Sequence, residues 1–445
     1  MISQGVHQPR TVHPAKLLNM NVNGKQVPFP RWFILLFAIF CIYLVVPFVD
    51  VPFLGLSISA PIFFLLTVHI VTKRGISFRG KYGLLAWLAG LTWLGITVSA
   101  IANGLISAGV NFNRQGAVMI VRYAYWITVM VITAYIASQA GMLKRIVRWL
   151  GWGGLILAFL RWSEVLIFAN IGAWTGTRFT TQNNYGLLFS IFSPFLLIRT
   201  VDHRGAKRLL SLLGYLLLLG AVAINGSRGS WVAVSTGLAL MLLMLALTQR
   251  KRLVGVLLLL SVLIAIGGVV FSSVPALYEP VMQRFDTMDS LEADKSYQIR
   301  VLMNQKSLRL FYDSPVFGVG VTRFRQVSVP LEIPRLLRYA PQEHFDVKTP
   351  HNSFLSFLAE NGLMGALPLG ILLIFLGVRG GMATLKGIKS HQYFLAAVFL
   401  AFVQMSMHMW AINNFGNTAP WFIYGLMGAV IVGSEDLINA DTACN

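Results

Sequence analysis

Apolar blocks of membrane-spanning length constrain the fold of this chain more than any other feature. Blocks rich in Leu, Phe and Trp alternate with short basic segments, and many blocks reach the roughly 20 residues that a helix needs to cross a bilayer. Only 12% of the 445 residues are charged and the mean hydropathy is +0.68, which excludes a soluble globular protein. We therefore expect an all-α, polytopic membrane protein.

The hydropathy pattern predicts about twelve spans. Their expected starts lie near residues 32, 53, 82, 117, 149, 185, 209, 229, 253, 353, 392 and 420. Short loops on one side carry 21 Lys and Arg residues, whereas those on the other carry only Arg114, Arg122, Arg178 and Arg228. Because cytoplasmic loops are enriched in basic residues, both termini are expected to be cytoplasmic. This topology explains the formal charge of +20 without a nucleic-acid partner.

This topology divides the chain into five segments. Their expected order is a cytoplasmic arm (1–31), spans one to nine (32–272), a large periplasmic loop (273–350), spans ten to twelve (351–434) and a cytoplasmic tail (435–445). The arm lacks an apolar h-region, so no cleavable signal peptide is expected. Within the loop, Ser296 to Tyr312 has helical spacing and Arg335 to Tyr339 is a second short helix candidate. We expect a small helical cap over the outer membrane surface.

A chain of about twelve spans is also compatible with a transporter. Transporters built from two six-span halves show matched halves, with their site near the bilayer midplane. Here the large insertion follows span nine instead of span six, and the two halves show no repeat. This asymmetry favours an enzyme whose site lies at the outer surface.

Arginines on the sparsely charged side are the first candidate site residues. Arg228 lies in a very short turn of sequence NGSRGSW, Arg178 precedes the polar run TTQNN, and Arg122 lies just inside the fourth span. A lone arginine in such a turn is most often a snorkelling residue. Several together present forked donors to phosphate oxygens, so the cluster would suit a pyrophosphate at the membrane surface.

His351 opens the tenth span and is the candidate proton acceptor. Asn352 or Ser353 can cap the helix that follows, and the positive end of that helix favours a neutral imidazole ring. A histidine at a helix start is otherwise a hydrogen-bonded structural residue. Only His344 and His351 are expected on the outward side.

Other charged or glycine-containing motifs are interpreted as structural. Glu360 requires a partner, and one of the arginines is a candidate. Arg161 and Glu164 are spaced to neutralise each other within the fifth span. The acidic run between residues 286 and 294 fits a solvated face better than a cation site, and residues 318–320 (Gly-Val-Gly) are interpreted as a turn.

Neither a metal nor a cofactor is expected. The two cysteines, Cys41 and Cys444, fall in the first span and in the tail, which leaves no cysteine-based site on the outward side. The chain contains no nucleotide-binding GxxxxGK[ST] loop, no HExxH and no GxSxG elbow.

These motifs resemble the O-antigen ligase family of Gram-negative lipopolysaccharide assembly. The same superfamily holds O-antigen polymerases and pilin oligosaccharyltransferases, which share the motifs, and the single large loop favours a ligase. The matching positions are Arg228 in an outward Ser-Arg-Gly turn, Arg300 in the loop, His351-Asn352 opening the next span, Glu360 to Gly362 and, more loosely, Arg178 with Asn183 and Asn184.

The resemblance implies an inverting, metal-independent membrane glycosyltransferase of the C type. It would transfer O-antigen glycan from undecaprenyl pyrophosphate to a sugar hydroxyl of lipid A-core, at the periplasmic face of the bacterial inner membrane. Arg228 and Arg300 would bind the pyrophosphate, and His351 would act as general base. The further expected substrate contacts are Arg178, Arg122, Asn352 and Asn184. A polymerase or other oligosaccharyltransferase is the alternative, followed by a glycolipid flippase.

Overall fold

The computed structural model describes most of the predicted spans and part of the large loop. The described residues are 29–44, 50–51, 56–57, 59–73, 76, 80–106, 114–168, 182–273, 278, 282, 295–328, 331 and 350–442. They are helical apart from turns and one short antiparallel pair, β1 (Asp50–Val51) with β2 (Leu56–Ser57). The expectation of a helical chain is confirmed for these residues.

Each of the twelve predicted spans coincides with a helix. In chain order these are α1 (Arg31–Tyr43), α2 (Ser59–Lys73), α3 (Gly80–Ile106), α4 (Arg114–Ser138), α5 (Met142–Phe168), α6 (Gln182–Asp202), α7 (Gly205–Asn225), α8 (Arg228–Thr248), α9 (Arg250–Ser273), α13 (Ser353–Lys389), α14 (Tyr393–Met409) and α15 (Thr418–Thr442). Within the described residues, six helices are long and apolar enough to cross a membrane by length and composition. The number of spans therefore stays a prediction.

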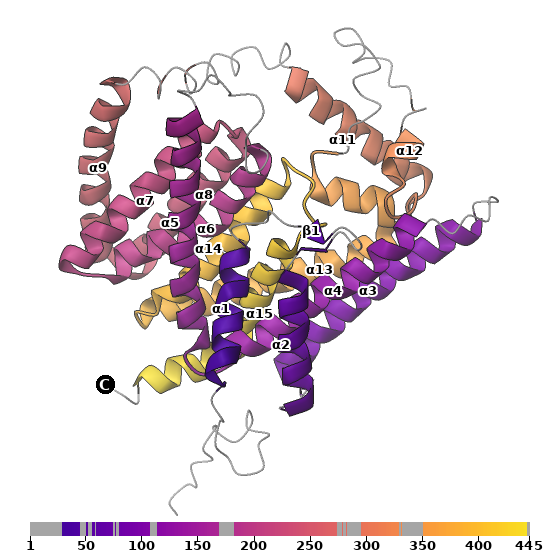
Figure 1. The fold of residues 1–445 in the computed structure, drawn as a ribbon, viewed down its shortest axis with the longest axis horizontal. Helices are drawn as coiled ribbons and strands as arrows, with labels where there is room; N and C mark the ends of the chain where they lie inside the picture. Colours follow the sequence, from indigo (N-terminus) through magenta and orange to yellow (C-terminus); the bar gives the residue numbers. More distant parts are fainter. Residues whose placement is uncertain are drawn as a thin grey trace, which may run out of the picture.

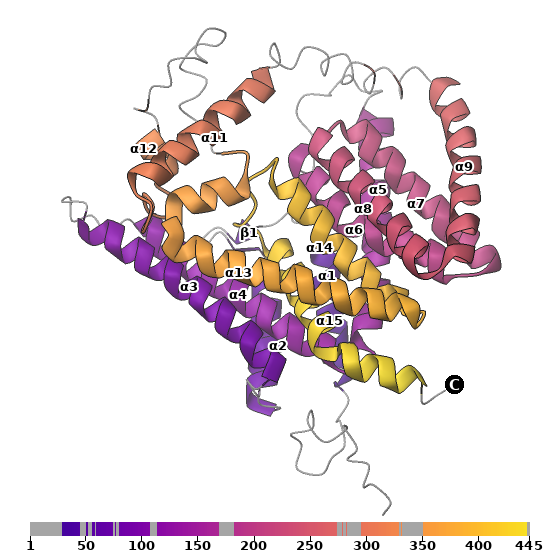
Figure 2. The same ribbon diagram turned by 180° about the vertical axis from the view of Figure 1, so that it is seen from behind.

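The helices pack in two groups joined by α14 and α15 (Figures 1 and 2). On one side, α3 packs along α13 and α4 packs along α15. On the other, α6 packs against α5, α7, α8 and α14. Between Tyr185 and Val201, α6 is almost entirely buried, which makes it the centre of this group.

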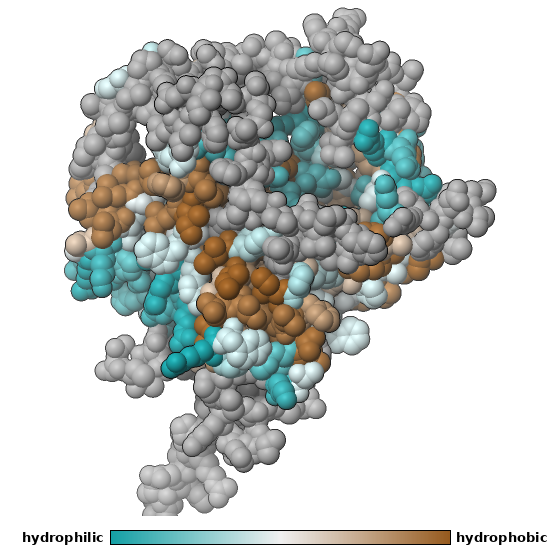
Figure 3. Space-filling model, viewed as in Figure 1, coloured by the Kyte–Doolittle hydropathy of each residue, from teal (hydrophilic) through white to brown (hydrophobic). Residues whose placement is uncertain are grey.

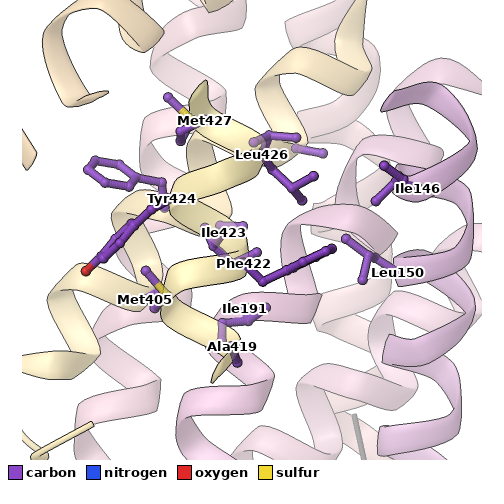
Figure 4. Close-up of a cluster of buried hydrophobic side chains, with 14 of the residues drawn as sticks. Ile146, Leu150, Ile191, Met405, Ala419, Phe422, Ile423, Tyr424, Leu426 and Met427 are labelled. Atoms are coloured by element: carbon purple, nitrogen blue, oxygen red, sulfur yellow. The ribbon is translucent and has the colours of Figure 1, made fainter. Parts of the chain in front are cut away.

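The core between these groups is apolar and largely aromatic. In Figure 4, Phe422 and Leu426 of α15 point toward Ile146 and Leu150 of α5. All four side chains are at most 1% exposed. Large apolar side chains also cover the outer surface, and Figure 3 shows two apolar patches with hydrophilic residues below them. Such patches are expected of helices that face lipid.

Part of the large loop packs against the start of α13. Helix α11 (Lys295–Asp313) extends one residue beyond the predicted range at either end, and the short α12 (Phe324–Ser328) was not predicted. Both contact α13 (Figure 2). The second predicted loop helix, Arg335 to Tyr339, and the acidic run at 286–294 lie outside the described residues.

A break at Gly362 divides α13 into two helical pieces. The residue has φ 57° and ψ −163°, a conformation that essentially only glycine adopts. The break interrupts the backbone hydrogen bonding on both sides, and residues 315–320 supply the missing partners. The bonds run from Val319 N to Ala359 O (2.9 Å), from Gly320 N to Glu360 O (2.9 Å), from Leu363 N to Pro315 O (2.8 Å) and from Met364 N to Val316 O (3.0 Å).

The partner of Glu360 is also backbone. The N–H groups of Thr322 and Phe324 donate hydrogen bonds to its carboxylate. The prediction that Glu360 pairs with an arginine is therefore not supported, because backbone N–H groups of the turn after residue 320 supply the hydrogen bonds that a buried carboxylate needs. The predicted Gly-Val-Gly turn is confirmed, with φ 66° at Gly318 and 97° at Gly320.

Candidate active site

The turn that carries Arg228 is held tightly in place. Helix α7 ends at Asn225, Gly226 adopts a left-handed conformation (φ 67°), and α8 begins at Arg228. The indole Nε1 of Trp231 donates to the carbonyl of Val222 at 2.9 Å, which closes the turn over the end of α7. Arg228, partly buried, is thus placed at one end of the bundle.

The start of α6 docks onto the same turn. The side-chain amide of Gln182 donates to the carbonyl of Asn225 at 2.5 Å, and the amide of Asn225 donates to the carbonyl of Gln182 at 2.9 Å. Two motifs that lie more than forty residues apart in the sequence are therefore neighbours in space. Asn184, a predicted substrate contact, lies in the first turn of α6 beside this pair.

His408 lies where these elements meet, although no sequence motif marks it as a site residue. Its ring is 1% exposed, and its Nε2 lies 3.1 Å from the carbonyl oxygen of Asn183. Gly229 and Gly186 make room for the ring: a Cβ on Gly186 would lie 2.8 Å from its Cε1, and one on Gly229 would lie 3.1 Å from its Nδ1. Only His344 and His351 were expected on the outward side, and the side of the membrane on which His408 lies stays untested.

Arg300 approaches the same place from α11. The residue is partly buried, and its positive charge acts on the ring of His408. Arg228 precedes Gly229, which contacts that ring. Arg228 is thus tied to His408 through Gly229, and Arg300, 72 residues further along the chain, adds positive charge to the surroundings of the same ring.

The start of α13 is tied to the turn that follows α14. Asn352 is the N-cap: its side-chain oxygen accepts from the N–H groups of Phe354 and Leu355, both at 3.1 Å. Ser353 Oγ donates to the carbonyl of Ile412 (2.5 Å) and accepts from the N–H of Asn414 (2.9 Å). The predicted cap is confirmed, and it places His351 just before α13. The start of α13 is anchored to Ile412, four residues beyond His408.

The remaining predicted site residues have different outcomes. Arg122 lies on α4, with its guanidinium 3.7 Å from the sulfur of Met119. The adjacent Tyr123 packs edge-on against Phe357 in the first piece of α13, with ring centroids 6.0 Å apart. Arg178 and His344 lie outside the described residues.

A buried ion pair lies in the C-terminal half of α5. Arg161 donates to Glu164 at 2.7 Å, as predicted from their spacing, and the hydroxyl of Tyr185 donates to the other carboxylate oxygen at 2.7 Å. The Arg161 guanidinium lies 5.5 Å from the centre of the Tyr185 ring. Because Tyr185 follows Asn184 directly, its hydrogen bond to Glu164 connects the first turn of α6 to α5. No three His, Cys, Asp or Glu side chains of the described segments come together as a metal site.

These features define an integral membrane protein of several helices, with arginines, asparagines and histidines gathered at one end. Residues 213–370 match the family model described as O-antigen ligase, and this match confirms the resemblance over that part of the chain. A comparison with curated proteins found no match. Arg228, Arg300, His351 and Asn352 fall inside the matched segment, whereas His408 falls outside it.

Proposed function

We propose that the protein transfers O-antigen glycan from undecaprenyl pyrophosphate to a sugar hydroxyl of lipid A-core. The reaction would take place at the periplasmic face of the bacterial inner membrane. The observation that supports this proposal most directly is the convergence of the Arg228 turn, Arg300 and the start of α6 around His408. The match to the O-antigen ligase model also supports it, because glycan transfer of this kind is the chemistry of that superfamily.

The arginines would bind the donor through its pyrophosphate. A guanidinium group stays protonated and offers two parallel N–H donors, which match the oxygens of a phosphate. Negative charge develops on the pyrophosphate as it departs, and Arg228 with Arg300 would stabilise that charge. No nucleotide is required, because the pyrophosphate is itself the leaving group. Arg178, Arg122, Asn352 and Asn184 would complete the substrate contacts.

His351 would act as general base in a single displacement. The acceptor hydroxyl oxygen forms a bond to the anomeric carbon while the bond from that carbon to the pyrophosphate oxygen breaks. The hydroxyl proton passes to the imidazole, and the electron pair of the broken bond leaves on the pyrophosphate. One such displacement inverts the anomeric configuration. The position of His351 before an anchored helix N-terminus supports a fixed and neutral ring.

An O-antigen polymerase would use the same residues with a different acceptor. Purified full-length protein in liposomes, supplied with the lipid-linked donor and with lipid A-core as the only other acceptor, separates the alternatives by product mass. A ligase yields glycan on lipid A-core, and a polymerase yields longer glycan on the carrier. A flippase leaves the sugar-phosphate bond intact.

Turnover should persist in EDTA, and a loss restored specifically by Mg²⁺ would contradict the metal-independent mechanism.

A further inference from the structure

A second cluster of arginines lies at the opposite end of the bundle, near the start of α5 and the end of α6. Arg199 of α6 extends across α5, where Gly151 leaves room: a Cβ at that position would lie 3.1 Å from the Arg199 Cδ. Its guanidinium carbon lies 5.0 Å from the centre of the Trp152 ring, within the range of a cation–π contact. Arg199 is therefore held in one place at the bundle surface.

Arg148 lies one turn before Trp152 and adds a second positive charge. It is exposed, and its charge acts on Arg199. The ion pairs that the described residues form with one another join Arg161 to Glu164 and Arg309 to Asp313. No carboxylate of the described segments therefore neutralises Arg148 or Arg199. The like charges of Arg148 and Arg199 repel each other, and an anion bound by both would remove that repulsion.

The apolar surface next to these arginines indicates which anion would bind. Trp152, Ile156 and Phe159 follow Arg148 along one face of α5 at helical spacing, and they are 53%, 39% and 66% exposed. The stripe runs from the charged start of α5 toward the middle of the helix. Such a surface can bind an acyl chain, whereas a free phosphate has no apolar group that could contact it.

We infer that Arg148 and Arg199 bind the phosphate of an anionic phospholipid whose acyl chain lies along Trp152, Ile156 and Phe159. A tryptophan at the boundary between headgroup and hydrocarbon fits this placement, because indole rings favour that depth. Basic pockets between helices at this surface are a known mode of lipid recognition. The site is separate from the candidate active site, since it lies at the other end of α5 and α6.

Lipid binding to the full-length protein in detergent tests this inference. The probe is phosphatidylglycerol, and native mass spectrometry measures the fraction of protein that carries one lipid. Each arginine contributes about fivefold to the affinity, on the basis of about 1 kcal/mol for each basic residue. The double variant Arg148→Gln, Arg199→Gln should therefore bind at least tenfold more weakly. Phosphatidylcholine with the same acyl chains should bind the wild type more weakly than phosphatidylglycerol.

A matched control removes the same charge from the same end of the bundle. Arg204 and Arg250 are exposed, and the double variant Arg204→Gln, Arg250→Gln should change the affinity by less than about threefold. An equal loss in this control would overturn the inference, because binding would then follow net charge alone. Wild-type affinity in the test variant, or displacement of the lipid by millimolar inorganic phosphate, would overturn it as well. A thermal unfolding midpoint close to the wild type shows that both variants fold.

Discussion

The Nε2 of His408 and the carbonyl oxygen of Asn183 lie 3.1 Å apart, and this contact connects the end of α14 to the start of α6. The same ring packs against Gly229, the residue that follows Arg228. His408 is enclosed by protein on these sides, so we expect it to position other residues. It would fix the Arg228 turn relative to the asparagines of α6.

We expect His408→Ala to weaken donor binding about tenfold, because the Arg228 turn loses its support. His408→Gln should restore most of the affinity, since the glutamine amide can donate to the Asn183 carbonyl in place of Nε2. The measurement is the KM for the lipid-linked donor, compared with kcat. A fall in kcat with unchanged KM would contradict a positioning role and would indicate direct participation in the chemistry.

Arg228→Lys and Arg300→Lys should each reduce turnover strongly although the protein still inserts. Lysine keeps the positive charge and loses the forked geometry that matches phosphate oxygens. Arg309→Lys is a matched control on α11, because Arg309 is a surface residue whose contact is an exposed ion pair with Asp313. If lysine at both 228 and 300 supports turnover close to the wild type, the arginines contribute charge alone.

His351→Ala should lower the turnover rate by about 10² to 10⁴, the usual effect of removing a positioned general base. Donor binding should persist, because the arginines remain. Equilibrium binding of the donor and single-turnover rates are the two measurements. His351→Gln is the informative companion variant: if it restores turnover, the residue is a hydrogen-bonding anchor, and the base lies elsewhere.

Gly362→Ala should destabilise the protein by about 1–3 kcal/mol, the usual cost of a side chain in such a conformation. In addition, a Cβ there would lie 2.4 Å from the carbonyl oxygen of Val316. Gly370→Ala lies on the same helix with nothing within 4 Å of its Cβ, and it should leave stability unchanged or slightly improved. Thermal unfolding in detergent compares the two. Equal midpoints would show that the break tolerates a side chain.

The predicted topology is tested by labelling single cysteines placed at Lys295 and Lys389. These residues begin α11 and end α13, and the basic residues of the short loops predict that they lie on opposite sides. The background carries Cys41→Ala and Cys444→Ala. An impermeant maleimide should label position 295 alone in intact spheroplasts. Labelling at 389 alone would invert the topology.

Local signals in the sequence predicted most helices and several of the contacts within them. Apolar runs located the twelve span candidates, Pro350-His351-Asn352 marked the start of α13, and the spacing of Arg161 and Glu164 indicated an ion pair. Each of these features depends on residues close together in the chain. A pattern read along one segment is sufficient for such features.

Contacts between distant segments could not be predicted in this way. No local pattern marks His408, because its partners Asn183 and Gly229 lie more than 170 residues away. The break at Gly362 could not be predicted from the sequence either. Glycine is common within membrane helices, and only the hydrogen bonds with residues 315–320 explain why this one adopts φ 57°.

The strap formed by residues 315–320 also constrains the order in which the protein is assembled. An unpaired backbone group costs several kcal/mol in a hydrocarbon environment, so a broken helix such as α13 is poorly suited to enter the bilayer alone. The strap precedes α13 in the chain, so it emerges from the ribosome first. Translocation of the loop would therefore be a prerequisite for stable insertion of α13, and a chain with the strap deleted should expose α13 to membrane quality-control proteases during biogenesis.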